Sequence, residues 1–166
     1  MLPNTEGQKP TGALRVGLVW GGSQEHGGFQ RRHITLAHYT PLAQVPGVHF
    51  YLLQKGPQAD EKPPAGMVCT DLNEDLKTWG DTAAVLTCLD LTISIDTAIV
   101  CLAGALGLLL WDIVPFECEF RWMLGKNPWF PSVRLFRQPR PGDWNSAVAR
   151  VAEELRMLSE QRQQAA

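Results

Sequence analysis

Short apolar segments alternate with helical segments along most of this chain, and that alternation predicts its fold class. Strands of this kind, joined by helices, form a mostly parallel sheet that is covered on both faces. The length of 166 residues is about that of one domain and is enough to bury a single hydrophobic core. The sequence therefore predicts one Rossmann-like three-layer α/β/α domain with a mainly parallel sheet.

The first half of the chain carries a strand, a helix and a second strand. The run "LRVGLVW" at 14–20 ends in "GGS", which indicates a buried strand that enters a tight turn. "VHFYLLQ" at 48–54 is the second expected strand. Between the two strands, apolar residues at helical spacing predict a helix, and these residues are Ile34, Leu36, Tyr39, Leu42 and Ala43.

The second half continues this pattern. Further strands are expected at 67–72, 91–95, 108–114 and 133–138. A helix is expected at 81–89 with Asp81 as its N-cap, and another at 97–106 with Gly107 suited to a C-terminal cap. From Asp143 onward, an amphipathic helix should pack on the sheet through Trp144, Ala147, Val148, Val151, Leu155 and Leu158.

The expected domain runs from 14 to 160, between a flexible leader at 1–13 and a flexible tail at 161–166. The leader lacks the cationic start and apolar stretch of a secretory signal, which predicts a cytoplasmic protein. The longest uncharged apolar run, from Ala98 to Trp111, has about 14 residues, fewer than the roughly 18 to 20 that cross a bilayer. No membrane span is therefore expected.

Composition argues against several other classes of function. The formal net charge of −2 gives no general attraction to nucleic acid or to anionic lipid, so neither is an expected partner. The four cysteines lie at wide spacings without a C-x-x-C pair, which argues against a zinc site and against a disulfide framework. We expect neither a metal nor a cofactor.

Polar clusters follow three of the expected strands, at the end where parallel sheets bind ligands. They are 21–30, Gln54-Lys55-Gly56 and Asp96-Thr97. The first has neither a Walker A sequence nor G-x-G-x-x-G, so its amides and Ser23 either cradle an anion or form an exposed loop. Lys55 either reaches a phosphate as a point charge or is merely solvated.

Asp96 and Thr97 stand at the start of the apolar helix. A short polar side chain there caps a helix, but a helix start at the carboxyl edge of a sheet is also a natural phosphate site. Cys101 lies four residues after Thr97 on the same helix face, so its side chain is expected to point at that site.

The sequence assigns no catalytic residue. The four histidines all lie in the first third of the chain, and none of them pairs with a nucleophile motif. Glu117 and Glu119 are too close in sequence to be assigned as an acid and a base without geometry.

Several blocks of the sequence together resemble one known family. They are "RVGLVWGGS", "RRHITL", "LLQKGP", "DTAAVLTCLDLTISIDTAIVCLAGALG", "PFECEFRWML" and "PWFPSVRLFRQPRPGDW". From about Leu14 to Leu158, the chain resembles the C-terminal domain of bacterial glycosyltransferase-like proteins. These domains often follow tetratricopeptide repeats, and they are related to heptosyltransferases and more distantly to O-linked N-acetylglucosamine (O-GlcNAc) transferases.

The resemblance implies one half of a GT-B fold, the half that binds a nucleotide-sugar donor without a required metal. It also implies a role for each polar cluster. Gly22 and Ser23 would line the phosphate loop, Gln54 and Lys55 would approach the nucleotide, Asp81 and Thr82 would lie beside the base or ribose, and Asp96 and Thr97 would meet the diphosphate. Cys101 stands where the family usually has a His that faces the diphosphate.

Two functions are compatible with this pattern. The first is the donor-binding half of a glycosyltransferase, which transfers a sugar only when a partner chain or a further segment supplies an acceptor domain. The alternative is a degenerate, non-catalytic domain that acts as an interaction or scaffold module for a partner or a second copy of itself. Departures from the family favour the alternative: Cys101 replaces His, Phe29 replaces Asp, and "EFRW" stands where "DWRW" is common.

Overall fold

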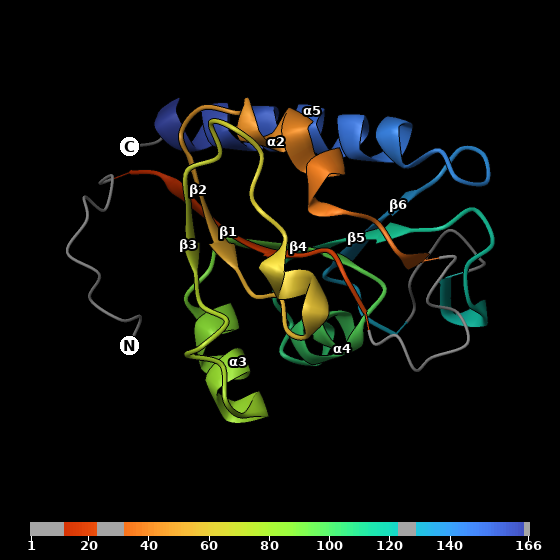
Figure 1. Ribbon diagram of the computed structural model, residues 1–166, viewed down its shortest axis with the longest axis horizontal. Helices are drawn as coiled ribbons and strands as arrows, with labels where there is room; N and C mark the ends of the chain where they lie inside the picture. Colours follow the sequence, from red (N-terminus) through yellow and green to blue (C-terminus); the bar gives the residue numbers. More distant parts are fainter. Residues whose placement is uncertain (1–11, 23–31, 123–128, 165–166) are drawn as a thin grey trace.

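A six-stranded parallel sheet forms the centre of the protein (Figure 1). The computed structural model describes residues 12–22, 32–122 and 129–164. The strand order is β3-β2-β1-β4-β5-β6, and every adjacent pair is parallel. The strands are β1 (Leu14–Val19), β2 (Val48–Leu52), β3 (Cys69–Asp71), β4 (Leu91–Ile95), β5 (Leu110–Val114) and β6 (Val133–Arg137). The predicted fold class and the sixth strand are confirmed.

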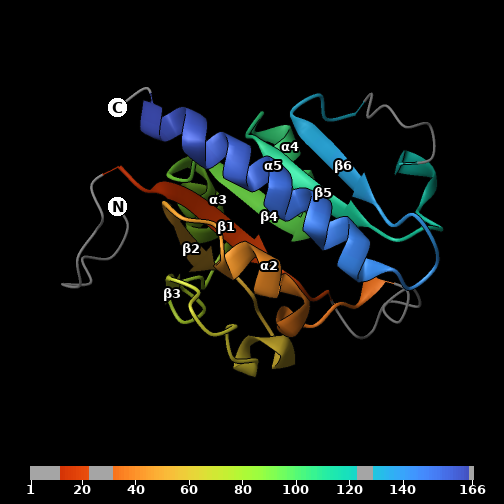
Figure 2. The same cartoon turned by 90° about the horizontal axis from the view of Figure 1, so that it is seen from above.

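Helices cover both faces of the sheet (Figure 1). On one face lie α2 (Thr40–Ala43), the preceding 3-10 turn η1 (Leu36–Tyr39) and α5 (Trp144–Gln164), and Figure 2 shows α2 and α5 side by side. On the other face lie α3 (Trp79–Thr87) and α4 (Ala98–Ala105). Two further 3-10 turns, η2 (Pro57–Asp60) and η3 (Phe120–Trp122), follow β2 and β5. Among the described residues, no helix is long and apolar enough to cross a membrane.

The hydrophobic core has one layer on each face of the sheet. Leu18 of β1 packs in the same cluster as Leu155 of α5. Its neighbour Val19 belongs to the opposite cluster, together with Val100 of α4. Successive residues of a strand point to opposite faces, so the continuous apolar run in β1 supplies both layers.

Helix α3 begins before the predicted position, so the assignment of Asp81 as its N-cap is wrong. Thr78 is the N-cap, and its hydroxyl accepts a hydrogen bond from the Asp81 amide at 3.1 Å. The Asp81 carboxylate in turn accepts one from the Thr78 amide at 2.7 Å. This reciprocal capping box needs a hydroxyl three residues before a carboxylate, and the sequence Thr78-x-x-Asp81 supplies it.

The other predicted helix limits show smaller differences. The segment at 34–43, where apolar residues at helical spacing predict a helix, forms only η1 and the single turn of α2. Pro41 in α2 has no amide hydrogen to donate. Gly107 follows the C-cap of α4 with a φ of 68°, as predicted for a C-terminal cap. Helix α5 runs to Gln164 and so includes residues 161–164 of the expected tail. Residues 1–11 of the expected leader lie outside the described residues.

Candidate functional site

A cleft of about 1030 Å³ opens at the carboxyl ends of the strands. Strands β2 and β3 lie on one side of β1, whereas the next strand, β4, lies on the other side. At such a switch point the loops that follow the central strands diverge, and open parallel sheets bind ligands there. The cleft is lined by the segments after β1, β2 and β4 and by the starts of α3 and α4.

Most of the predicted donor-binding residues line this cleft. They are Gly22, Gln54, Lys55, Thr82, Asp96, Thr97 and Cys101. Ser23 lies outside the described residues, so its predicted role in the phosphate loop stays a prediction. Asp81 is not among the residues that line the cleft, and its carboxylate closes the capping box of α3.

Gln54 joins the exits of β1 and β2. Its side-chain oxygen accepts hydrogen bonds from the amides of Trp20 at 3.0 Å and Gly21 at 2.8 Å. Its side-chain nitrogen donates to the carbonyls of Gly21 at 3.0 Å and Lys55 at 2.8 Å. With its side chain bonded in this way and buried, Gln54 shapes the wall of the cleft and keeps the Gly21–Gly22 backbone in place.

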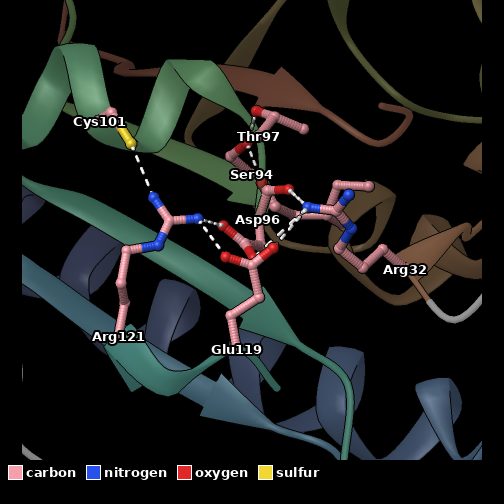
Figure 3. Close-up of polar contacts among 8 residues, drawn as sticks. Arg32, Ser94, Asp96, Thr97, Cys101, Glu119 and Arg121 are labelled. Carbon is pink, nitrogen blue, oxygen red and sulfur yellow. Dashed lines mark hydrogen bonds and ion pairs between the residues drawn. The ribbon is translucent and has the colours of Figure 1, made fainter. Parts of the chain in front are cut away.

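Asp96 lies at the floor of the cleft between two arginines (Figure 3). Its side chain is only 3% exposed, and its oxygens lie 3.6 Å from Arg32 Nη1 and 3.5 Å from Arg121 Nη2. Burial raises the pKa of the Asp96 carboxyl, and the nearby arginine charges act in the opposite direction. The interpretation of Asp96 as a helix cap is wrong, because Thr97 is the N-cap residue of α4.

Glu119 and Arg121 complete this ion-pair cluster from the segment after β5. Arg121 Nη2 lies 2.7 Å from Glu119 Oε2, and Arg121 Nη1 donates to Cys101 Sγ at 3.3 Å (Figure 3). Arg32 Nη1 lies 3.7 Å from Glu119 Oε1. The predicted orientation of Cys101 toward the site is therefore confirmed, and its sulfur faces a guanidinium group.

The start of α4 faces the cleft through Ala98 and Ile99. The N-cap Thr97 makes no side-chain capping hydrogen bond, and its hydroxyl instead lies 3.2 Å from the Ser94 hydroxyl. The first amides of any helix have no acceptor within the helix itself, and they carry the positive end of its dipole. This geometry can stabilise an anion beside Thr97.

The opposite side of the cleft is formed by the segment after β2 and the start of α3. Lys55 reaches from the end of β2, and its Nζ donates to the Asn73 carbonyl at 2.6 Å. Trp79, the first residue of α3, lines the cleft with 61% of its surface exposed. A flat aromatic surface and an ammonium group thus lie on the side away from Arg121.

Sequence reasoning left Glu119 without a role and missed Arg121 and Trp79 as members of the site. For the first two, the signal was available, because the turn "ECEFRW" follows an expected strand whose carboxyl end lies at the same edge of the sheet. Trp79 carried no such signal, because an isolated aromatic residue near a helix start is compatible with the core. In the described ranges, no group of three or more His, Cys, Asp or Glu side chains is placed to hold a metal ion.

Comparison with known proteins gives one informative similarity. The chain is 31% identical over 151 residues to Protein FlbA of Caulobacter vibrioides, and the match covers 86% of this chain and 25% of FlbA. The chain thus spans about a quarter of the length of that relative. The chain matches no protein-family model and no solved structure. The name of this relative states no activity, so function has to be argued from the cleft.

Proposed function

We propose that this protein binds a nucleoside diphosphate sugar in the cleft and acts as the donor-binding half of a glycosyltransferase. The observation that carries the proposal is the charge of the cleft. Among the described residues, its lining includes four cationic side chains (Arg32, Lys55, Lys77 and Arg121) and two carboxylates (Asp96 and Glu119). The chain as a whole has a formal net charge of −2, so positive charge is concentrated at this site.

The arrangement of the groups favours an elongated anion over a simple ion. The arginines and the start of α4 lie at one side of the cleft, which suits a diphosphate. Lys55 and the exposed ring of Trp79 lie at the other side, which suits an aromatic base and its ribose. The sugar and the transfer reaction rest on the resemblance to the glycosyltransferase-like family, and we assign no catalytic base.

A titration with three nucleoside diphosphates and one nucleoside monophosphate, CMP, tests the proposal. At least one of UDP, GDP, ADP and CMP should release or absorb heat on binding and should raise the melting temperature. Lys55→Ala should weaken that binding about tenfold, because one charge-assisted contact of about 1.4 kcal/mol is lost. Lys62→Ala, in an exposed loop outside the cleft, is the matched control. The proposal fails if the intact protein binds none of these nucleotides.

Two observations favour the alternative function of an interaction module. Arg32 and Arg121 are already paired with carboxylates, and large aromatic side chains are exposed near the cleft, with Phe120 73% and Trp79 61% exposed. An interaction module should form a dimer or a stable complex through this face. Sedimentation of the wild-type protein and of Phe120→Ser at high concentration tests this, and a strictly monomeric wild type would argue against self-association.

A further inference from the structure

One carboxylate in the cleft is shared by two arginines that come from distant parts of the chain (Figure 3). Glu119 lies 2.7 Å from Arg121 and 3.7 Å from Arg32. Its side chain is 46% exposed, whereas those of the two arginines are 28% and 20% exposed. The guanidinium groups therefore belong to the wall of the cleft, and the carboxylate reaches them from the side open to solvent.

The second carboxylate of the cluster is fixed. Asp96 is almost fully buried and faces both guanidinium groups from the floor of the cleft. Two guanidinium charges and one buried carboxylate leave one positive charge uncompensated. Glu119 compensates it in this structure, but its exposure leaves the place open to any anion that binds the two arginines more strongly.

We propose that the Glu119 carboxylate occupies a phosphate subsite of the cleft and is exchanged for a phosphate group when a ligand binds. This inference rests on the proposed function, and it adds that the site is held closed by an internal competitor. A phosphate group carries more charge and more acceptor oxygens than a carboxylate, and it matches the fork of an arginine equally well. The start of α4 beside Thr97 offers the phosphate amide donors as well.

The exchange has a clear electrostatic advantage. The arginines are paired with Glu119 in the ligand-free protein and with a phosphate group in the complex. Neither state therefore holds uncompensated, partly buried cations. The affinity for the ligand is lower than that of a permanently open subsite. The reason is that the ligand must displace Glu119 and binds only the fraction of molecules in which the subsite is open. Removal of the Glu119 charge should therefore strengthen anion binding. Removal of an acidic residue that lies outside the cleft should not.

Calorimetric titration of the full chain with inorganic pyrophosphate and with nucleoside diphosphates tests the exchange. Glu119→Gln should bind pyrophosphate about fivefold more tightly than the wild type, because an exposed ion pair that no longer competes is worth up to about 1 kcal/mol. Glu160→Gln makes the same charge change on exposed α5, outside the cleft, and should leave the affinity unchanged. Arg121→Gln should weaken pyrophosphate binding, whether it is introduced into the wild-type protein or into the Glu119→Gln variant.

The possible outcomes separate this inference from the proposed function. An unchanged or weaker affinity of Glu119→Gln for pyrophosphate, repeated with Glu119→Ala, overturns the exchange even if nucleotides bind. A tighter Glu119→Gln that binds nucleoside diphosphates no better than pyrophosphate supports the exchange and argues against a nucleotide as the ligand. If no variant binds either compound, both proposals are wrong.

Discussion

The carboxyl group of Asp112 on β5 is enclosed by the core beside the candidate site. Asp112 is fully buried, and within the described part of the chain neither of its oxygens has a hydrogen-bond partner. Burial raises its pKa well above the ordinary range, and the negative charge of Asp96 acts in the same direction. A group in this environment keeps its proton in the folded state, because a lone buried charge costs far more than a neutral acid.

This protonation makes stability depend on pH. In the unfolded chain Asp112 ionises near its ordinary pKa, so above that value the folded state holds a proton that the unfolded state has released. The contribution of Asp112 to stability is therefore fully present below the unfolded pKa and is lost as the pH rises toward the folded pKa. The loss amounts to about 1.4 kcal/mol per pH unit within that window.

Asp112→Asn should remove this dependence. The stability of the variant relative to the wild type should be greater at pH 8 than at pH 5, because the wild type loses stability as the pH rises toward the folded pKa of Asp112. Urea unfolding at both pH values measures the difference, with Asp60→Asn at an exposed position as the control. A constant difference between Asp112→Asn and the wild type would show that Asp112 is ionised in the folded protein.

At the scale of elements, α4 joins the cleft to the second core layer. Its first residues line the cleft, and Val100 and Ala103 are fully buried against the sheet. Near its end, Gly104 lies against the ring of Phe130, and a Cβ atom at that position would overlap the ring and lie 2.8 Å from Phe130 Cβ. The absence of a side chain at Gly104 therefore sets how closely the segment before β6 approaches this helix.

A pair of glycine substitutions tests that contact. Helix propensity alone favours alanine over glycine by about 1 kcal/mol. Gly104→Ala should nevertheless destabilise the protein by about 1 to 3 kcal/mol, because the methyl group overpacks against Phe130. Gly80→Ala in the first turn of α3 meets its nearest atom, Thr78 Oγ1, only at 3.4 Å and should be neutral or stabilising. Equal effects in thermal unfolding would refute a specific contact at Gly104.

For the whole molecule, α5 is the element that closes one of the two core layers. Its residues at helical spacing, among them Val151 and Leu155, are fully buried against the sheet, while Met157 is 41% exposed. The helix thus covers one face of the sheet, opposite to α3 and α4 (Figure 1). This layer does not reach the cleft lining, so a change in it should alter stability without altering the site.

Two truncations in α5 separate the two sides of this helix. Leu155→Ala should lower the free energy of unfolding by about 2 to 5 kcal/mol, because it leaves a cavity in the core. Met157→Ala should lower the free energy of unfolding by much less than Leu155→Ala does. Denaturant unfolding measures both, and the nucleotide or pyrophosphate affinity of folded Leu155→Ala should match that of the wild type. A similar loss in the two variants would contradict the packing of α5.

The layout of the fold was predictable from sequence because its signals are local. Short apolar runs, helical spacing in α5 and the glycine after α4 each report on a few neighbouring residues. The position of the cleft was predictable too, because parallel strands place their carboxyl ends at one edge. The cap of α3 was missed where two local signals compete, since Thr78 and Asp81 are both good N-cap residues.

Local residue patterns were enough to predict the α/β class, the parallel sheet and the set of polar segments that meet at its carboxyl edge. The pairing of side chains within that set depends on the three-dimensional path of the chain. Asp96 stands at a helix start, where its local sequence predicts a cap, but it lies between Arg32 and Arg121. Glu119 pairs with Arg32 across more than eighty residues of chain. Ion pairs between such distant residues depend on strand order and loop path, which no local pattern of residues encodes.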